Sequence, residues 1–344
     1  RKITLYFRCN VQKLLREKQM IKRSFFHTKA MYPDMQIILK PAQPKSGSML
    51  GQSSNALRGL SVSTIFSLAR LHVYMPICFF CAMVGLDITG NAQSLIPLLT
   101  IGLTNTFALV ATFAFNDAED APDDKLARSV RNVIALGNAP RESGYLIAAT
   151  ATIISLLLSA IAGSIVVLIT LAILITGFLY SWRPFRMKAK PFWDAFTHAV
   201  VGGLIFLSPA WSSQKGVIWE NHVIPICLIF SLGTVLAILN HELYEYEDDL
   251  KANTRTTVVA LGKRKSYWIV GCISLLLLSL IIHVYRLGVF PMISILSFVI
   301  VGSSLMLIPI MLYPRQAVSV SKRMIPWAMN LGAFSAIITW YIRG

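Results

Sequence analysis

Long apolar segments constrain this chain more than any other feature of its sequence. From residue 62 onward we identify nine, each long enough to cross roughly 30 Å of hydrocarbon as a helix. They cover 62–86, 93–115, 143–162, 164–182, 193–212, 222–241, 266–286, 290–313 and 325–342. Because a helix satisfies its own backbone hydrogen bonds inside a bilayer, segments of this length predict transmembrane helices. Only 14% of the residues are charged, against roughly 25% in a soluble domain. The predicted fold is therefore an all-α, polytopic membrane bundle of about nine helices.

The placement of the basic residues gives the predicted orientation of the bundle. A net charge of +16 could by itself indicate a nucleic-acid partner. The lysines and arginines gather instead in the loops after spans two, four, six and eight, and the opposite loops carry little beyond Lys215 and Arg286. This asymmetry is the positive-inside pattern, so we predict a lipid bilayer and no nucleic acid. The N-terminus and these loops are predicted on the cytoplasm-equivalent side, of either the endoplasmic reticulum or the mitochondrial inner membrane.

Residues 1–61 have a different composition. They are polar and basic, and Glu17 and Asp34 are their only acidic residues. This composition is typical of a mitochondrial transit peptide, and also of a disordered basic tail on an anionic membrane surface. We predict that residues 1–61 lie outside the fold and that 62–344 form the transmembrane domain.

The first of two acidic clusters follows the second apolar span. Asn116, Asp120 and Asp124 are spaced four residues apart, so on a helix they share one face with Asp117 beside them. Like charges at this spacing repel each other, and Mg²⁺ would relieve that repulsion because it prefers hard oxygen ligands. Pro122 can kink or break the helix before Asp124. Alone, the cluster could equally be a solvated acidic loop.

The second acidic cluster follows the sixth span. Glu245 and Asp249 are again four residues apart, and Arg255 follows within reach of a phosphate oxygen. The two clusters together hold ten of the chain's sixteen acidic residues, and both lie on the same predicted side of the membrane. If the carboxylates of the two clusters face each other, they could hold two Mg²⁺ ions with a diphosphate between them.

These residues resemble the signatures of the UbiA-type intramembrane prenyltransferase family. Asn116-Asp117-x-x-Asp120-x-x-x-Asp124 matches its first signature without a gap. The second, an Asp-x-x-x-Asp element with a basic-Thr-apolar-Gly stretch after it, is met by Glu245-x-x-x-Asp249 and the stretch 255–262. A third feature, Tyr-Ser followed by Pro, Arg and Lys, appears over 180–191. The resemblance extends from about residue 65 to the C-terminus.

The resemblance implies nine helices around a central cavity and a Mg²⁺-dependent transfer of an isoprenyl group from its diphosphate to a lipophilic, aromatic or quinone-like acceptor. The implied catalytic residues are Asp117, Asp120 and Asp249. The implied metal ligands are Asn116, Asp117, Asp120, Asp124, Glu245 and Asp249. The implied substrate-binding residues are Asn116, Lys125, Arg131, Tyr180, Lys188 and Arg255, among which Tyr180 would face an allylic cation with its ring.

Two departures from the family pattern keep a second enzymatic reading open. Glu245 stands where the family usually has Asp, and Arg131-Asn132 and Leu136-Gly137 replace Arg-Pro and Ser-Gly. The alternative is a membrane terpene cyclase that acts on farnesyl or geranylgeranyl diphosphate without an external acceptor. A transporter is disfavoured, because transporters usually place ion sites near the membrane midplane and both clusters here lie at span ends.

Overall fold

The computed structural model describes residues 62–88, 95–126, 132–212, 223–251 and 254–288, together with 331, 332, 335 and 338. All of these residues belong to one compact unit, Gln52–Gly344. The predicted N-terminal segment 1–61 and most of predicted spans eight and nine lie outside the described residues.

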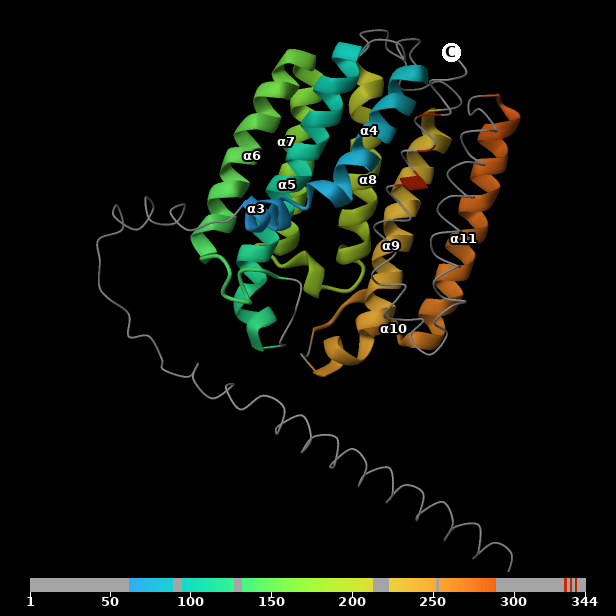
Figure 1. Cartoon of the computed structure of the whole chain (residues 1–344). Coiled ribbons are helices and arrows are strands. Elements are labelled where there is room, and N and C mark those ends of the chain that lie inside the picture. The colour runs from blue at the N-terminus through green and yellow to red at the C-terminus, as the bar shows by residue number, and fades with distance from the viewer. Residues whose placement is uncertain are drawn as a thin grey trace, which may run out of the picture. The chain divides into compact units, whose positions relative to one another are not determined.

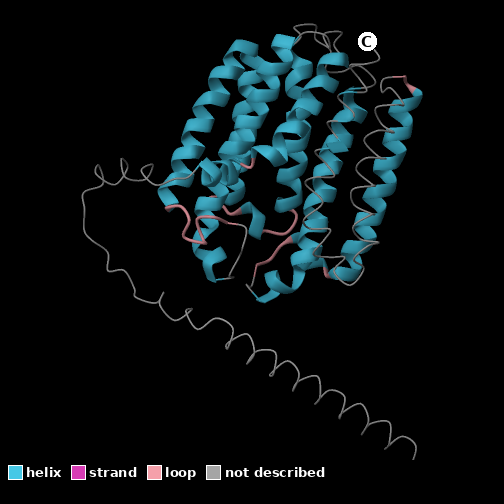
Figure 2. Cartoon of the chain, viewed as in Figure 1, coloured by secondary structure: helices cyan, strands magenta, loops and turns pink. Residues whose placement is uncertain are grey.

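The described part of the chain is helical (Figures 1 and 2). The main helices are α3 (Val62–Ala69), α4 (Leu71–Ile88), α5 (Leu95–Leu126), α6 (Arg141–Ala162), α7 (Ser164–Ser181), α8 (Trp193–Ser212), α9 (Val223–Lys251) and α11 (Lys263–Arg286). A 3₁₀ turn, η1 (Met187–Ala189), and a short helix, α10 (Thr257–Leu261), lie in the connections. Five of the described helices are long and apolar enough to cross a membrane, and α4 and α8 contain shorter apolar stretches. The prediction of an all-α membrane bundle is confirmed.

Two details differ from a simple reading of the spans. The first span is not one helix, because Arg70 adopts a left-handed φ of 46° between α3 and α4. This conformation is uncommon for a residue with a side chain. By contrast, α5 continues past Pro122 to Leu126, so the first acidic cluster lies entirely on one helix.

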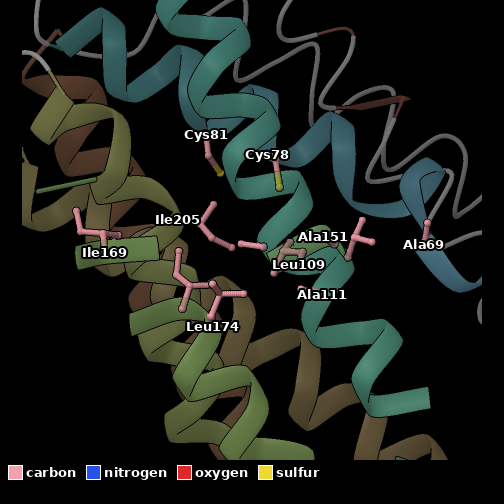
Figure 3. Packing of buried hydrophobic residues seen from close by; sticks show 12 residues of the cluster. Ala69, Cys78, Cys81, Leu109, Ala111, Ala151, Ile169, Leu174 and Ile205 are labelled. Atoms are coloured by element: carbon pink, nitrogen blue, oxygen red, sulfur yellow. The ribbon is translucent and has the colours of Figure 1, made fainter. Parts of the chain in front are cut away.

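Helix α5 is the centre of the bundle. The most apolar 18-residue stretch of α5 is 67% buried, against 6–33% for the corresponding stretches of the other four membrane-span candidates. Helix α5 packs against α3, α4, α6, α7 and α8. Small side chains on α5 permit this close approach. At the contact with α6, a Cβ added to Gly144 would lie 2.9 Å from Ala118 Cβ and 3.0 Å from Ala114 O. Figure 3 shows the apolar cluster that surrounds α5, with Cys78 and Leu109 facing Ile205 and Leu174 from other helices.

Three of the described connections, 132–140, 182–192 and 254–256, lie at one end of the bundle (Figures 1 and 2). Helices α5 and α9 also end there. The two acidic clusters, at the C-terminal ends of α5 and α9, therefore lie on the same side, as the sequence predicts.

Candidate active site

The first acidic cluster forms a continuous polar stripe on the last turns of α5. Asp117 is buried at 3% exposure, whereas Asn116, Asp120 and Asp124 are half-buried. Asp117 and Asp124 each interact electrostatically with Asp120. Three carboxylates in such surroundings require positive charge or hydrogen-bond donors nearby, and other elements of the fold supply both.

Arg70 provides the positive charge for Asp117. Its Nη2 donates to Asp117 Oδ1 at 2.5 Å, and its guanidinium lies 5.4 Å from the centre of the Phe113 ring. Phe113 in turn stacks on Tyr74 with ring centres 4.2 Å apart. The break between α3 and α4 therefore places the Arg70 guanidinium against the buried Asp117 carboxylate. Leaving that carboxylate without a partner would be costly.

Lys188 provides the positive charge for the next turn of the stripe. It lies in η1, and its Nζ contacts Asp120 Oδ1 and donates to Asn116 Oδ1 at 3.1 Å. Ser181, at the end of α7, donates to the same Asn116 oxygen at 2.7 Å. The 182–192 connection therefore lies over the first cluster, which joins the first and third sequence features in space.

Asn132 holds the far end of the stripe. Its Nδ2 donates to Asp124 Oδ2 and to the Asp117 carbonyl, each at 2.8 Å. Its Oδ1 accepts from the amides of Ile134 and Ala135. Asn132 is buried, and its hydrogen bonds thus join α5 to the 132–140 connection.

The intervening acids of α5 hold the surrounding loops. Glu119 is buried and accepts from the Tyr145 hydroxyl at 2.5 Å and from Arg141 at 3.2 Å. Asp123 pairs with Arg186 at 2.6 Å. These contacts anchor α6 and the 182–192 connection to the helix that carries the first cluster.

The second acidic cluster lies on the last turns of α9. Glu245 contacts His241 Nε2 at 3.2 Å, one turn earlier. Asp249 accepts from Thr256 Oγ1 at 3.4 Å, and its carbonyl accepts from the Thr254 amide at 2.9 Å. The segment after α9 therefore folds back against the carboxylate that ends the second signature.

Tyr180 links the two clusters. It lies on α7 with its ring edge-on to His198, 5.1 Å between ring centres. Its hydroxyl interacts electrostatically with Glu242 and Asp194 most strongly, and then with Asp120 of the first cluster and Asp249 of the second.

Other predicted residues are placed differently. Lys125 is exposed at the end of α5, and Arg255 is exposed between α9 and α10. Arg131 lies outside the described residues. Sequence analysis missed the hydrogen bonds of Asn132 to α5 and the pairing of Arg70 with Asp117. A charged residue inside an apolar span was the available signal for Arg70, but its partner depends on helix packing.

The oxygens of this region suit a divalent cation chemically. Carboxylate and amide oxygens are the ligands that Mg²⁺ prefers. Within the described ranges, no three Asp, Glu, His or Cys side chains are gathered closely enough to hold a metal ion together. Protein cations instead contact Asp117 and Asp120. A metal ion at these carboxylates would therefore compete with Arg70 and Lys188.

Comparison with known proteins gives a consistent result. Residues 73–338 match the profile of the UbiA prenyltransferase family. The structure is similar to a UbiA homolog from Archaeoglobus fulgidus bound to GPP and Mg²⁺, at 20% identity and a TM-score of 0.58, covering 80% of this chain and 99% of that chain. The complex of a UbiA homolog from the same organism with DMAPP and Mg²⁺ gives 20% identity and a TM-score of 0.57, with the same coverage of both chains. An apo UbiA homolog from Aeropyrum pernix K1 gives 14% identity and a TM-score of 0.59, covering 78% of this chain and 97% of that chain. At these identities the likeness establishes a shared fold. A search of curated proteins found no significant match.

Proposed function

Because the chain belongs to the UbiA prenyltransferase family, we propose that it is a magnesium-dependent intramembrane enzyme that transfers an isoprenyl group from its diphosphate to a lipophilic acceptor. The observation that carries this proposal is the placement of the two acidic clusters at the same end of the bundle, on the last turns of α5 and α9. Lys188, a basic side chain, contacts Asp120 of the first cluster. Similar folds from Archaeoglobus fulgidus bind GPP or DMAPP together with Mg²⁺.

The residues that would hold Mg²⁺ are the oxygen donors of the two signatures, namely Asn116, Asp117, Asp120, Asp124, Glu245 and Asp249. When bound, Mg²⁺ would neutralise the charge that develops on a leaving diphosphate. The partners seen in the structure keep these side chains in place without it: Asn132 fixes Asp124, and Ser181 fixes Asn116.

Lys188 is the strongest candidate for contacting the diphosphate. Its ammonium group lies on the polar stripe itself, whereas Lys125 and Arg255 are exposed. Once the charge of Asp120 is met by another cation, the Lys188 ammonium can pair with phosphate oxygens, which are the groups it binds as a point charge. Arg70 is half-buried beside Asp117 and can act in the same way.

Product formation needs an apolar tail site and exclusion of water. The diphosphate would sit at the end of the bundle where the connections gather, with its tail among the helices in the bilayer. The Tyr180 ring, next along the chain to Ser181, which donates to Asn116, would face the allylic cation and stabilise it through its π-face. Phe115 packs against Tyr145 and Phe178, so its role is in the core.

The function is tested by mass spectrometry of products. Purified protein in nanodiscs is given Mg²⁺ and dimethylallyl, geranyl, farnesyl or geranylgeranyl diphosphate, with and without a lipid extract or added phenolic and quinone precursors. We expect pyrophosphate release and a prenylated product only when an acceptor is present. A cyclic hydrocarbon formed without acceptor would indicate the cyclase instead.

A matched pair of variants tests the site. Asp120→Ala removes a predicted metal ligand, and Glu142→Ala removes an exposed carboxylate at the start of α6. We expect Asp120→Ala to abolish diphosphate consumption and Glu142→Ala to retain it. Normal consumption by Asp120→Ala would overturn the assignment.

A further inference from the structure

Two buried carboxyl groups outside both signatures meet in the interior of the bundle. Asp194 is in the first turn of α8 and is 0% exposed, and Glu242 is on α9 and is 4% exposed. The two side chains interact with each other electrostatically. Burying such a pair is costly unless its remaining oxygens are satisfied.

The first residues of α10 supply the donors that satisfy the pair. Asp194 Oδ2 accepts from the Thr257 amide at 2.6 Å, and Oδ1 accepts from the Thr257 hydroxyl and from the Ala195 amide, the latter at 2.6 Å. Glu242 Oε2 accepts from the Val258 amide at 3.1 Å. Asp194 thus accepts hydrogen bonds from Thr257 and Ala195, and Glu242 accepts one from Val258.

The same segment carries a contact to the second acidic cluster. Thr256, next to Thr257, donates its hydroxyl to Asp249 Oδ2 at 3.4 Å. Thr256 is itself buried at 6% exposure and caps α10. Hydrogen bonds therefore connect Asp194 and Glu242 to residues 257 and 258, and Thr256 to the carboxylate of Asp249.

We propose that Asp194 and Glu242 are positioning residues that hold residues 256–258 so that Thr256 orients Asp249 for the metal and diphosphate. This inference rests on the proposed function, because it assigns Asp249 to the metal site. It adds residues that lie in neither signature and act only through Thr256. If the pair served stability alone, its loss would lower the free energy of unfolding and leave the Mg²⁺ affinity of the folded protein unchanged.

The chemistry of the pair predicts opposite results for two isosteric substitutions. In Asp194→Asn, the new NH₂ faces the Thr257 amide in one orientation and the Ala195 amide in the other, and both are donors, so at least one of the accepted hydrogen bonds is lost. In Glu242→Gln, the carbonyl oxygen can still accept from Val258 and the NH₂ can still donate to Asp194. We therefore expect Asp194→Asn to release the segment and Glu242→Gln to keep it.

The direct readout is amide hydrogen exchange of residues 256–258 in the full chain in nanodiscs. We expect exchange to be faster by at least about tenfold in Asp194→Asn, the equivalent of one hydrogen bond to a charged group. In Glu242→Gln and in the surface control Glu142→Gln, we expect exchange like that of the original chain. Equal exchange in Asp194→Asn and Glu242→Gln would overturn the inference.

The second readout is the binding of Mg²⁺ in the presence of inorganic pyrophosphate, followed by calorimetry. Thr256→Val removes the hydroxyl that reaches Asp249 without touching the pair, and Thr256→Ser keeps it. We expect Thr256→Val and Asp194→Asn to need at least about fivefold more Mg²⁺ for half-saturation, within the range of one hydrogen bond. Thr256→Ser should behave like the original chain.

The outcomes separate the two proposals. If the original chain binds Mg²⁺ and the variants respond alike, only the positioning role fails. If the original chain shows no binding of Mg²⁺ with pyrophosphate, the proposed function fails with it. Should Asp194→Asn not fold, the comparison of Thr256→Val with Thr256→Ser still decides, and identical Mg²⁺ responses of these two would overturn the inference.

Discussion

Replacing Lys188 by methionine should tighten the binding of Mg²⁺ while it weakens turnover. The Lys188 ammonium contacts Asp120 and Asn116. Both are proposed metal ligands, so Mg²⁺ must displace the ammonium before it binds. Methionine keeps most of the length of the side chain and removes the charge.

The structure sets the size of this effect. The Lys188 and Asp120 side chains are only 15% and 17% exposed, so solvent screens their contact weakly. A hydrogen bond to a charged group contributes about 1.5–3 kcal/mol, and each 1.4 kcal/mol changes an affinity by about tenfold. We therefore expect Lys188→Met to lower the dissociation constant of Mg²⁺ by roughly tenfold to a hundredfold in the absence of diphosphate.

Isothermal titration calorimetry of the protein in nanodiscs measures this affinity. Lys190→Met is the matched control, because Lys190 is exposed two residues further on and its loss reports the general effect of removing one positive charge. Diphosphate turnover of Lys188→Met should fall, since its ammonium is the proposed phosphate contact. An unchanged Mg²⁺ affinity, or equal tightening in both variants, would refute the reasoning.

Three further results are expected. Arg70→Met should lower the free energy of unfolding by about 3–5 kcal/mol because it leaves Asp117 buried and unpaired, and the double variant with Asp117→Asn should recover much of this loss in thermal unfolding. Gly144→Val should lower the melting temperature, because its Cβ would lie 2.9 Å from Ala118 Cβ, whereas Gly271→Val, where a Cβ meets no atom of the described residues within 4 Å, should have a much smaller effect. Excess EDTA should stop pyrophosphate release, and added Mg²⁺ should restore it; full activity in EDTA would contradict the need for a divalent cation.

The helical architecture was predictable because the bilayer permits few alternatives. Predicted spans two to seven coincide with α5, α6, α7, α8, α9 and α11 to within a few residues at most ends. The larger differences are at the acidic ends, where α5 and α9 continue for several turns beyond the apolar residues. Hydropathy indicates where the apolar residues of a span end. Helices α5 and α9 continue beyond that point through their acidic turns, to Leu126 and Lys251.

The sequence predicts a candidate site as a set of residues and not as a set of contacts. Periodicity places Asn116, Asp120 and Asp124 on one face, because it depends only on helix geometry. The pairing of Lys188 with Asp120 joins residues 68 positions apart, and no local pattern encodes it. The Asp194–Glu242 pair was missed for the same reason, since it joins acids of two different helices, α8 and α9.

The contacts of the first cluster also explain why site and bundle form together. Its partners come from four places: Arg70 at the α3–α4 break, Ser181 at the end of α7, Lys188 in the 182–192 connection and Asn132 after α5. Arg70, Ser181 and Lys188 reach the stripe only when their neighbouring helices are packed against α5. A substitution that separates α5 from α6, such as Gly144→Val, should therefore reduce Mg²⁺ affinity as well as stability, although Gly144 lies in the helix contact and contributes no ligand. Loss of stability with unchanged Mg²⁺ affinity in the folded fraction would show that the stripe is organised by α5 alone.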